Sequence, residues 1–129
     1  MLIVAAVGND GPAAPPSYPA SLPGVIAVTA VDARERALPE AGRALHVDFA
    51  APGADMKGAA PGGGLTVLRG TSYAAPFVAA RLSEYYPRLQ IDRIEPSVRD
   101  LIAEARDLGR KGPDPVYGHG LVCGSCATR

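Results

Sequence analysis

The apolar positions near the start of the chain form continuous runs instead of alternating with polar ones. Leu2–Val7 is apolar throughout and stops at a Gly-Asn-Asp-Gly turn, and Val25–Val31 is a second run, rich in β-branched residues. Continuous runs are typical of strands in a parallel sheet that is covered on both faces. The pattern predicts an α/β fold with a mostly parallel sheet, in which Leu2–Val7 lacks a neighbour on one side.

Two shorter apolar segments predict further strands. His46–Ala51 ends at a Pro-Gly pair, and Leu65–Leu68 follows three consecutive glycines. No helix follows these glycines directly, so we interpret them as a tight turn and not as a phosphate-binding loop. The intervening segment Asp32–Gly42 is polar and charged, and we expect it to be exposed.

The pattern changes to helical spacing in the second half of the chain. Thr71–Tyr86 carries small apolar residues three and four positions apart, and Pro76 falls close enough to its start to be tolerated. Pro87 ends this predicted helix. A second helix is predicted from about Pro96 to Leu108, with Gly109 as its stop signal.

Composition narrows the function classes. The chain has 129 residues with 13 basic and 13 acidic side chains, so no net charge attracts it to nucleic acid or to anionic lipid. No apolar run is long enough to span a bilayer. The apolar start has neither a basic flank nor a cleavage site, so we expect no signal peptide. We predict a single partial domain over residues 1–129 that needs no cofactor.

Two polar residues stand where an α/β fold places its chemistry. Ser72 lies where a strand gives way to a buried helix, so its backbone N–H is directed to where an oxyanion could bind. Asn9 follows the first predicted strand, at the end of a sheet where ligands bind. Each also has a structural interpretation, Ser72 as a helix N-cap and Asn9 as a turn residue.

These segments, taken in order, resemble the C-terminal half of the catalytic domain of the subtilases, the subtilisin-like serine proteases. Each matching piece is weak alone, and their common order makes the resemblance specific. The pieces are Ala-Ala-Val-Gly-Asn at 5–9, Tyr-Pro-Ala at 18–20, Val-Asp-Phe-Ala-Ala-Pro-Gly at 47–53, Gly-Thr-Ser-Tyr-Ala-Ala-Pro at 70–76 and Tyr-Gly-His-Gly-Leu-Val at 117–122. The resemblance implies a partial three-layer α/β/α fold whose N-terminal half is missing.

The resemblance implies a serine endopeptidase that acts on a polypeptide through an acyl-enzyme. It makes Ser72 the nucleophile, and it makes the Asn9 side chain and the Ser72 N–H the oxyanion hole. Five residues would bind substrate: Ala5, Ala6 and Gly8 as one wall of the pocket for the residue before the cut, and Tyr18 and Pro19, whose peptide bond could be cis, near its base.

The family supplies its catalytic Asp and His from segments before the amide-bearing strand, and neither segment occurs in these residues. His46 and His119 stand where the family has no catalytic base. We therefore expect the isolated chain to be inactive and an upstream chain to provide the Asp and the His. The alternative is a non-catalytic scaffold that binds a peptide or a partner. Secretion is usual in the family, but the residues leave localisation open.

The end of the chain leaves two further hypotheses open. Cys123 and Cys126 cannot form a disulfide framework, but together with His119 they have the spacing of a weak metal site. His119 could otherwise serve Ser72 as a base in a small hydrolase. The simplest interpretation of His119 is a loop residue between two glycines.

Overall fold

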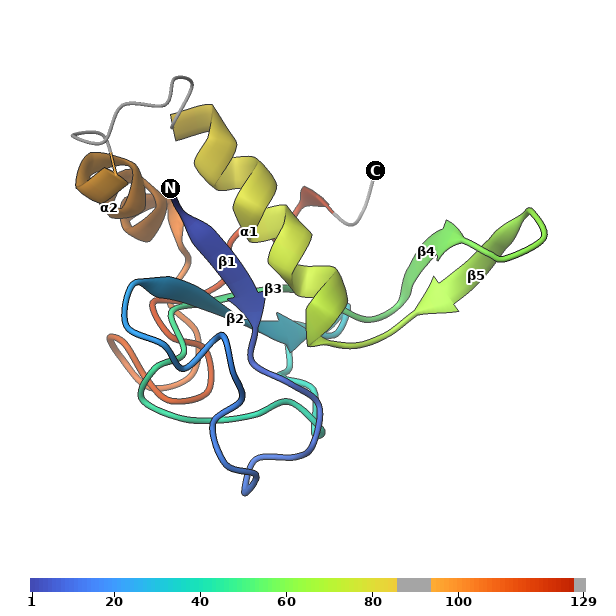
Figure 1. Ribbon diagram of the computed structural model, residues 1–129, viewed down its shortest axis with the longest axis horizontal. Coiled ribbons are helices and arrows are strands. Elements are labelled where there is room, and N and C mark those ends of the chain that lie inside the picture. The colour runs from blue at the N-terminus through green and yellow to red at the C-terminus, as the bar shows by residue number, and fades with distance from the viewer. Residues whose placement is uncertain (86–93, 127–129) are drawn as a thin grey trace.

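The computed structural model describes residues 1–85 and 94–126 (Figure 1). Strands and helices follow the order that the apolar pattern predicts, with one additional strand. The elements are β1 (Ile3–Ala6), β2 (Val25–Val31), β3 (Phe49–Pro52), β4 (Met56–Ala59), β5 (Leu65–Leu68), α1 (Thr71–Tyr85) and α2 (Ile94–Glu104).

The first three strands form a parallel sheet in the order β1-β2-β3. Val4 is in register with Ile26, and Val28 is in register with Phe49. The predicted parallel sheet of an α/β fold is confirmed. As predicted, β1 is paired on one side only within the described part of the chain.

Both helices contribute to one hydrophobic core. α1 lies across the sheet in Figure 1 and contacts all three parallel strands, and α2 packs beside α1. The inward residues of α1 recur at helical spacing, which is why its small side chains are buried and allow close packing on the sheet. This core contains Ile26, Val28, Ala30, Leu38, Ala41, Phe49, Ala51, Ala54, Ala74, Val78, Leu82, Leu101 and Val122.

Among the described residues, loop segments cover the opposite face of the sheet. One cluster of buried apolar residues packs β1 and β2 against the loops that follow these strands. A second cluster packs β2 and β3 against the C-terminal segment. The first contains Ala5, Val7, Ala20, Ala27 and Val47, and the second contains Val31, Ala50 and Leu121. Burial on both faces explains why these strands are apolar throughout.

The third strand begins later than predicted. Its predicted start, His46, lies outside β3, because residues 44–47 form a turn in which the Val47 N–H donates to the Ala44 carbonyl over 3.1 Å. Asp48 then ties this turn to β2, since its Oδ2 accepts a hydrogen bond from the Ala27 N–H at 2.8 Å. Phe49 is therefore the first residue of the strand.

A β-hairpin replaces the isolated fourth strand of the prediction. β4 and β5 pair antiparallel, and Gly62, Gly63 and Gly64 form the connecting loop with positive φ angles. The predicted turn is confirmed, but β4 was missed because its sequence, Met-Lys-Gly-Ala, has no strand-like run of apolar residues. The hairpin projects from the body of the molecule (Figure 1).

The helix boundaries also differ. α1 begins at Thr71 as predicted and contains Pro76, whereas its predicted end at residues 86–87 lies outside the described residues. α2 begins at Ile94, so that Pro96 is its third residue. It ends at Glu104 and not at Leu108, because Arg106 already exchanges backbone hydrogen bonds with Leu121.

The segment Asp32–Gly42 is not uniformly exposed, contrary to prediction. Leu38 and Ala41 are almost fully buried in the main core. The polar residues before them form a turn, in which the Asp32 carboxylate accepts hydrogen bonds from the N–H groups of Arg34 and Arg36. The turn directs the two apolar side chains inward while the charged ones remain near the surface.

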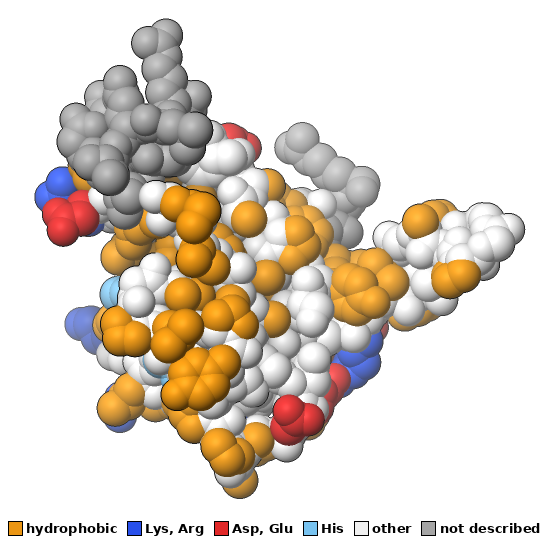
Figure 2. Space-filling model, in the orientation of Figure 1, with side chains coloured by type: hydrophobic (Ala, Val, Ile, Leu, Met, Phe, Trp, Pro, Cys, Tyr) orange, Lys and Arg blue, Asp and Glu red, His pale blue; other side chains and the backbone are white. Residues whose placement is uncertain are grey.

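Hydrophobic side chains occupy much of the face shown in Figure 2, including the area over β1 and the loop below it. Large apolar residues exposed in this N-terminal part of the chain are Met1, Ile3, Tyr18 and Leu22. None of the helices in the described ranges is long and apolar enough to cross a membrane.

Candidate active site

A hydrogen bond joins the turn after β1 to the first turn of α1. The Thr71 N–H donates to Oδ1 of Asn9 over 3.0 Å, across 62 positions of sequence. The first N–H groups of a helix have no acceptor within the helix, so an amide oxygen at this point stabilises the helix start. This contact brings Asn9 next to the turn that carries Ser72.

The same bond fixes the orientation of the Asn9 amide. Its oxygen must face the Thr71 N–H, which is a donor, so its Nδ2 carries the two protons available to another acceptor. Ser72 follows directly as the second residue of α1, and it is exposed. Its own N–H belongs to the first-turn donors that no helical carbonyl reaches. Two donors thus lie near the exposed serine.

Two glycines lie at this strand-to-helix turn. Gly70 has a φ of 137°, and a Cβ at this position would lie 3.4 Å from Nδ2 of Asn9. The Gly70 N–H donates to the Gly53 carbonyl at 2.8 Å, so the end of β3 contacts the strand-to-helix turn. A Cβ on Gly53 would approach within 2.4 Å of the Ala30 Cβ. Gly53 is therefore required for steric reasons, whereas Gly70 is favoured by its positive φ.

Glu40, which the sequence analysis did not single out, connects the two halves of the site. Its carbonyl accepts a hydrogen bond from the Gly11 N–H at 2.8 Å. Its carboxylate accepts two from the Arg69 guanidinium, at 2.6 and 2.9 Å, which also lowers the pKa of Glu40. Arg69 directly precedes Gly70. The sequence signal that could have indicated this return of the chain is the pair of apolar residues Leu38 and Ala41 within a polar segment, since both are buried.

The predicted substrate-binding residues lie at β1 and the adjoining loop. Ala5 is buried and Ala6 half-buried on β1. A Cβ on Gly8 would lie 2.9 Å from Oγ of Ser17, so the loop carrying Tyr18 and Pro19 is next to Gly8. The Tyr18–Pro19 peptide bond is cis. Tyr18 is 78% exposed.

His119 lies near the N-terminal end of β3, whereas the turn that carries Ser72 lies near the C-terminal end of this strand. Its backbone N–H donates to the Asp48 carbonyl at 2.7 Å, and its ring packs against Phe49 with 5.7 Å between centroids. Ser72 lies beyond Gly70, which contacts Gly53 after the opposite end of that strand. Four residues of strand separate these ends by about 13 Å. This arrangement opposes the hypothesis that His119 serves Ser72.

The cysteines do not support the metal hypothesis. Cys123 and Cys126 form a disulfide with each other, which removes both thiolates as ligands. Among residues 1–85 and 94–126, no group of three or more His, Cys, Asp or Glu side chains is arranged to hold a metal ion. A cavity of about 660 Å³ adjoins this disulfide, and neither Asn9 nor Ser72 lines it.

Comparison with known proteins identifies the family. The sequence profile of the subtilase family matches residues 1–120. The chain belongs to the subtilase family. The family match covers nearly the whole chain, as the order of its motifs predicted.

Curated relatives of this subtilase chain are proteases. It is 34% identical over 126 residues to the minor extracellular protease Epr of Bacillus subtilis, a match that covers 95% of this chain and 19% of Epr. It is 33% identical over 132 residues to subtilisin BL of Lederbergia lenta, covering 100% of this chain and 46% of subtilisin BL.

Solved structures confirm the fold. The prenylagaramide maturation protease PagA matches with a TM-score of 0.76 and 32% identity, over 98% of this chain and 49% of PagA. A lanthipeptide protease matches with a TM-score of 0.78 at 22% identity, over 98% of this chain and 50% of that protein. The subtilase chain thus spans half or less of the length of these four relatives.

Proposed function

We propose that this chain carries the nucleophile and oxyanion-hole part of a serine endopeptidase site. Ser72 is the nucleophile, and Asn9 Nδ2 and the Ser72 N–H are the oxyanion donors. A catalytic Asp and His come from an upstream segment, as the family resemblance implies. The observation that supports the proposal best is the hydrogen bond from the Thr71 N–H to Asn9 Oδ1.

The orientation of the Asn9 amide gives the two donors a catalytic use. When Ser72 Oγ attacks a peptide carbonyl, negative charge develops on the carbonyl oxygen. Donors that are already directed to that oxygen stabilise the transition state without reorganisation. Asn9 meets this condition because its oxygen is held by Thr71, which leaves the NH₂ group for the substrate. The leaving Ser72 proton requires the absent base, so the chain alone is inactive in this proposal.

The substrate in this proposal is an extended polypeptide that lies along residues 5–9 and the segment before Ser72. Ala5, Ala6 and Gly8 have no bulky side chains, so the wall beside β1 admits the residue before the cut. In this proposal Tyr18 and Pro19 contribute to the base of that space, which is supported by the closeness of the neighbouring residue Ser17 to Gly8. Upstream residues complete the pocket and determine which side chain fits it.

An active-site phosphonate probe tests the proposal. The chain is incubated with the probe alone and together with the upstream half of a subtilase catalytic domain. We expect labelling only of the combined halves, and we expect Ser72→Ala to abolish it. Labelling that survives Ser72→Ala would contradict the proposal. Association of the halves without any labelling would instead support the alternative, a non-catalytic binding module.

Asn9→Asp provides a matched control for the oxyanion role. Aspartate keeps an oxygen for the Thr71 N–H but loses the NH₂ donor and adds a negative charge. We expect the stability of the chain to remain close to that of the parent, while turnover by the combined halves falls about a hundred- to a thousandfold. Undiminished kcat in Asn9→Asp would remove Asn9 from the catalytic machinery.

A further inference from the structure

The disulfide between Cys123 and Cys126 connects no distant parts of the fold. It closes a turn in which the Cys126 N–H also donates to the Cys123 carbonyl, at 2.9 Å. A cross-link over so short a loop restricts the unfolded chain less than one between distant segments. The segment before it is already held by backbone, since the Val122 N–H donates to the Ala50 carbonyl at 2.8 Å. The disulfide therefore contributes little to the stability of the fold, and stabilisation alone does not explain its presence.

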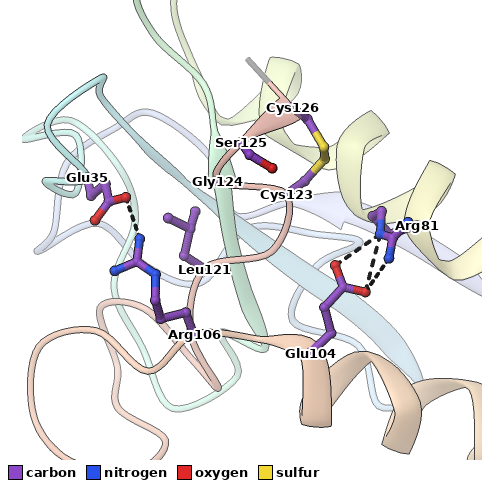
Figure 3. Close-up of a pocket in the computed structure, with 9 residues that line it drawn as sticks. All are labelled: Glu35, Arg81, Glu104, Arg106, Leu121, Cys123, Gly124, Ser125 and Cys126. Atoms are coloured by element: carbon purple, nitrogen blue, oxygen red, sulfur yellow. Dashed lines mark hydrogen bonds and ion pairs between the residues drawn. A yellow bond between two sulfur atoms is a disulfide. The ribbon is translucent and has the colours of Figure 1, made fainter. Parts of the chain in front are cut away.

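The disulfide is accessible from solvent and from a cavity. Cys126 is exposed, and Cys123 is half-buried against the main core. Both line the cavity of about 660 Å³ shown in Figure 3. Cys123 also has a φ of 61°, a left-handed conformation that is unfavourable for a residue with a side chain. Opening the ring would allow that residue to relax.

The charges around the cavity do not oppose an incoming thiolate. Arg81 is paired with Glu104 at 2.6 Å, and Arg106 is paired with Glu35 (Figure 3). The four charged residues that line the cavity therefore balance. An anionic nucleophile meets no net negative charge from them on its way to the exposed sulfur.

We propose that Cys123 and Cys126 form a reversible thiol–disulfide exchange site that accepts electrons from dithiol reductants. A reductant thiolate attacks Cys126 Sγ and forms a mixed disulfide, and the electron pair of the broken bond leaves on Cys123 Sγ, which takes a proton from water. The second thiolate of the reductant then attacks the reductant sulfur that is bonded to Cys126 Sγ. Cys126 leaves as a thiolate, which also takes a proton. The protein gains two electrons and two protons, and the reductant becomes a cyclic disulfide.

Reduction in this proposal changes one turn and leaves the fold intact. Leu121 exchanges two backbone hydrogen bonds with Arg106, and Val122 remains bonded to Ala50. These anchors precede Cys123, so they do not depend on the cross-link. The redox state therefore controls the turn at 123–126 and the adjoining wall of the cavity. The exchange site is independent of the proposed peptidase function.

A redox titration of the native chain tests the proposal. The protein is equilibrated without oxygen in graded mixtures of reduced and oxidised dithiothreitol, treated with an alkylating reagent and weighed by mass spectrometry. We expect both cysteines to become labelled together, the labelling to reverse in oxidised buffer, and the circular dichroism to stay constant. Labelling that requires denaturant, or reduction that unfolds the chain, would overturn the proposal.

Variants separate exchange from a structural role. In Cys123→Ser/Cys126→Ser we expect faster hydrogen exchange at the amide of position 126 and unchanged protection at Leu121 and Val122. Loss of the fold in this variant would show that the bond is structural. Among the single variants, Cys123→Ser retains the exposed sulfur, so we expect it to form a mixed disulfide with oxidised glutathione faster than Cys126→Ser does. The reverse order would contradict the assigned point of attack.

Discussion

The Asn9 side chain connects the turn after β1 to the first turn of α1 through one hydrogen bond to Thr71. At the scale of single residues, the site is assembled from such small contacts. Gly70 adopts the positive φ of the turn beside the amide, and Gly53 allows the end of β3 to reach the same turn. A change at any of these positions therefore affects stability and the site together.

Asn9→Ala removes the acceptor for the Thr71 N–H. We expect the free energy of unfolding to fall by about 1 kcal/mol, as for the loss of a helix cap. Urea denaturation monitored by circular dichroism measures this change. Asp10→Ala is the matched control at the neighbouring exposed residue, and we expect it to stay within about 0.5 kcal/mol of the parent. Equal midpoints for both variants would contradict the role given to Asn9.

Gly53→Ala places a methyl group 2.4 Å from the Ala30 Cβ and 2.8 Å from the Gly70 carbonyl oxygen. Both neighbours belong to the packed centre of the molecule, so the chain must shift, and we expect a loss of about 3 kcal/mol or more. Gly62→Ala serves as the comparison, because its Cβ would meet nothing within 4 Å and only its positive φ is unfavourable. We expect about 1–2 kcal/mol there. Thermal unfolding of the two variants should therefore rank Gly53→Ala as the less stable, and the opposite order would refute the steric argument.

At the scale of elements, charged side chains fasten α1 to α2. Glu104 accepts hydrogen bonds from Arg81 of α1 and from the Tyr85 hydroxyl at 2.7 Å. The Arg81 hydrogen bond is the main cause that lowers the pKa of Glu104 below its usual 4.5. The contact joins the helix that carries Ser72 to the only other helix in the described part of the chain.

Glu104→Gln should lower stability at neutral pH by about 1 kcal/mol, because a partly buried ion pair becomes a neutral contact. Since the folded-state pKa of Glu104 is depressed, its contribution is present above pH 4.5 and is lost as pH falls through the folded-state pKa. The difference between variant and parent should therefore shrink in urea titrations at low pH. Glu84→Gln is the control: the Glu84 side chain is 61% exposed and pairs with Arg81 at the surface of α1. We expect a change within about 0.5 kcal/mol for this variant.

The elements differ in how well the sequence predicts them. β2 is predicted at both ends because a continuous β-branched run between turn residues has one simple interpretation. β4 cannot be predicted from an apolar run, since its sequence Met-Lys-Gly-Ala forms a strand through pairing with β5. The end of α2 depends on a partner from the C-terminal segment, because Leu121 bonds to Arg106. Periodicity carries no information on such long-range contacts.

The candidate site shows the same division. Ser72 and Asn9 could be proposed as site residues from the sequence, because a serine at a strand-to-helix turn and an amide after a strand have recognisable chemistry. Glu40 could not, because its role depends on a backbone contact to Gly11 and an ion pair to Arg69. The disulfide could not be predicted either, because it depends on the local turn that brings Cys123 and Cys126 together.

At the scale of the whole molecule, the exposed edge of β1 is the feature with the largest expected consequence. β1 is bonded to β2 alone in the described part, and Ile3 is 42% exposed beside it. An unpaired apolar strand edge is a template for association with another chain. We therefore expect the isolated chain to self-associate as its concentration rises.

Sedimentation velocity over a concentration series measures this association. Ile3→Lys should shift the distribution toward the monomer, because a lysine on an edge strand opposes pairing. Leu65→Lys is the matched control on the projecting hairpin, where Leu65 is 70% exposed, and it should leave the association unchanged. A parent chain that is monomeric at high concentration, with one sharp unfolding transition, would contradict the prediction.

The central proposal is that Asn9 and Ser72 act on one carbonyl oxygen. The most direct measurement is a crystal structure of the phosphonate adduct formed by this chain together with the upstream half of a subtilase catalytic domain. The proposal predicts phosphorus bonded to Ser72 Oγ, with one phosphonyl oxygen about 2.7–3.1 Å from both Asn9 Nδ2 and the Ser72 backbone nitrogen. An adduct on another residue, or a phosphonyl oxygen outside hydrogen-bond reach of Asn9, would contradict it.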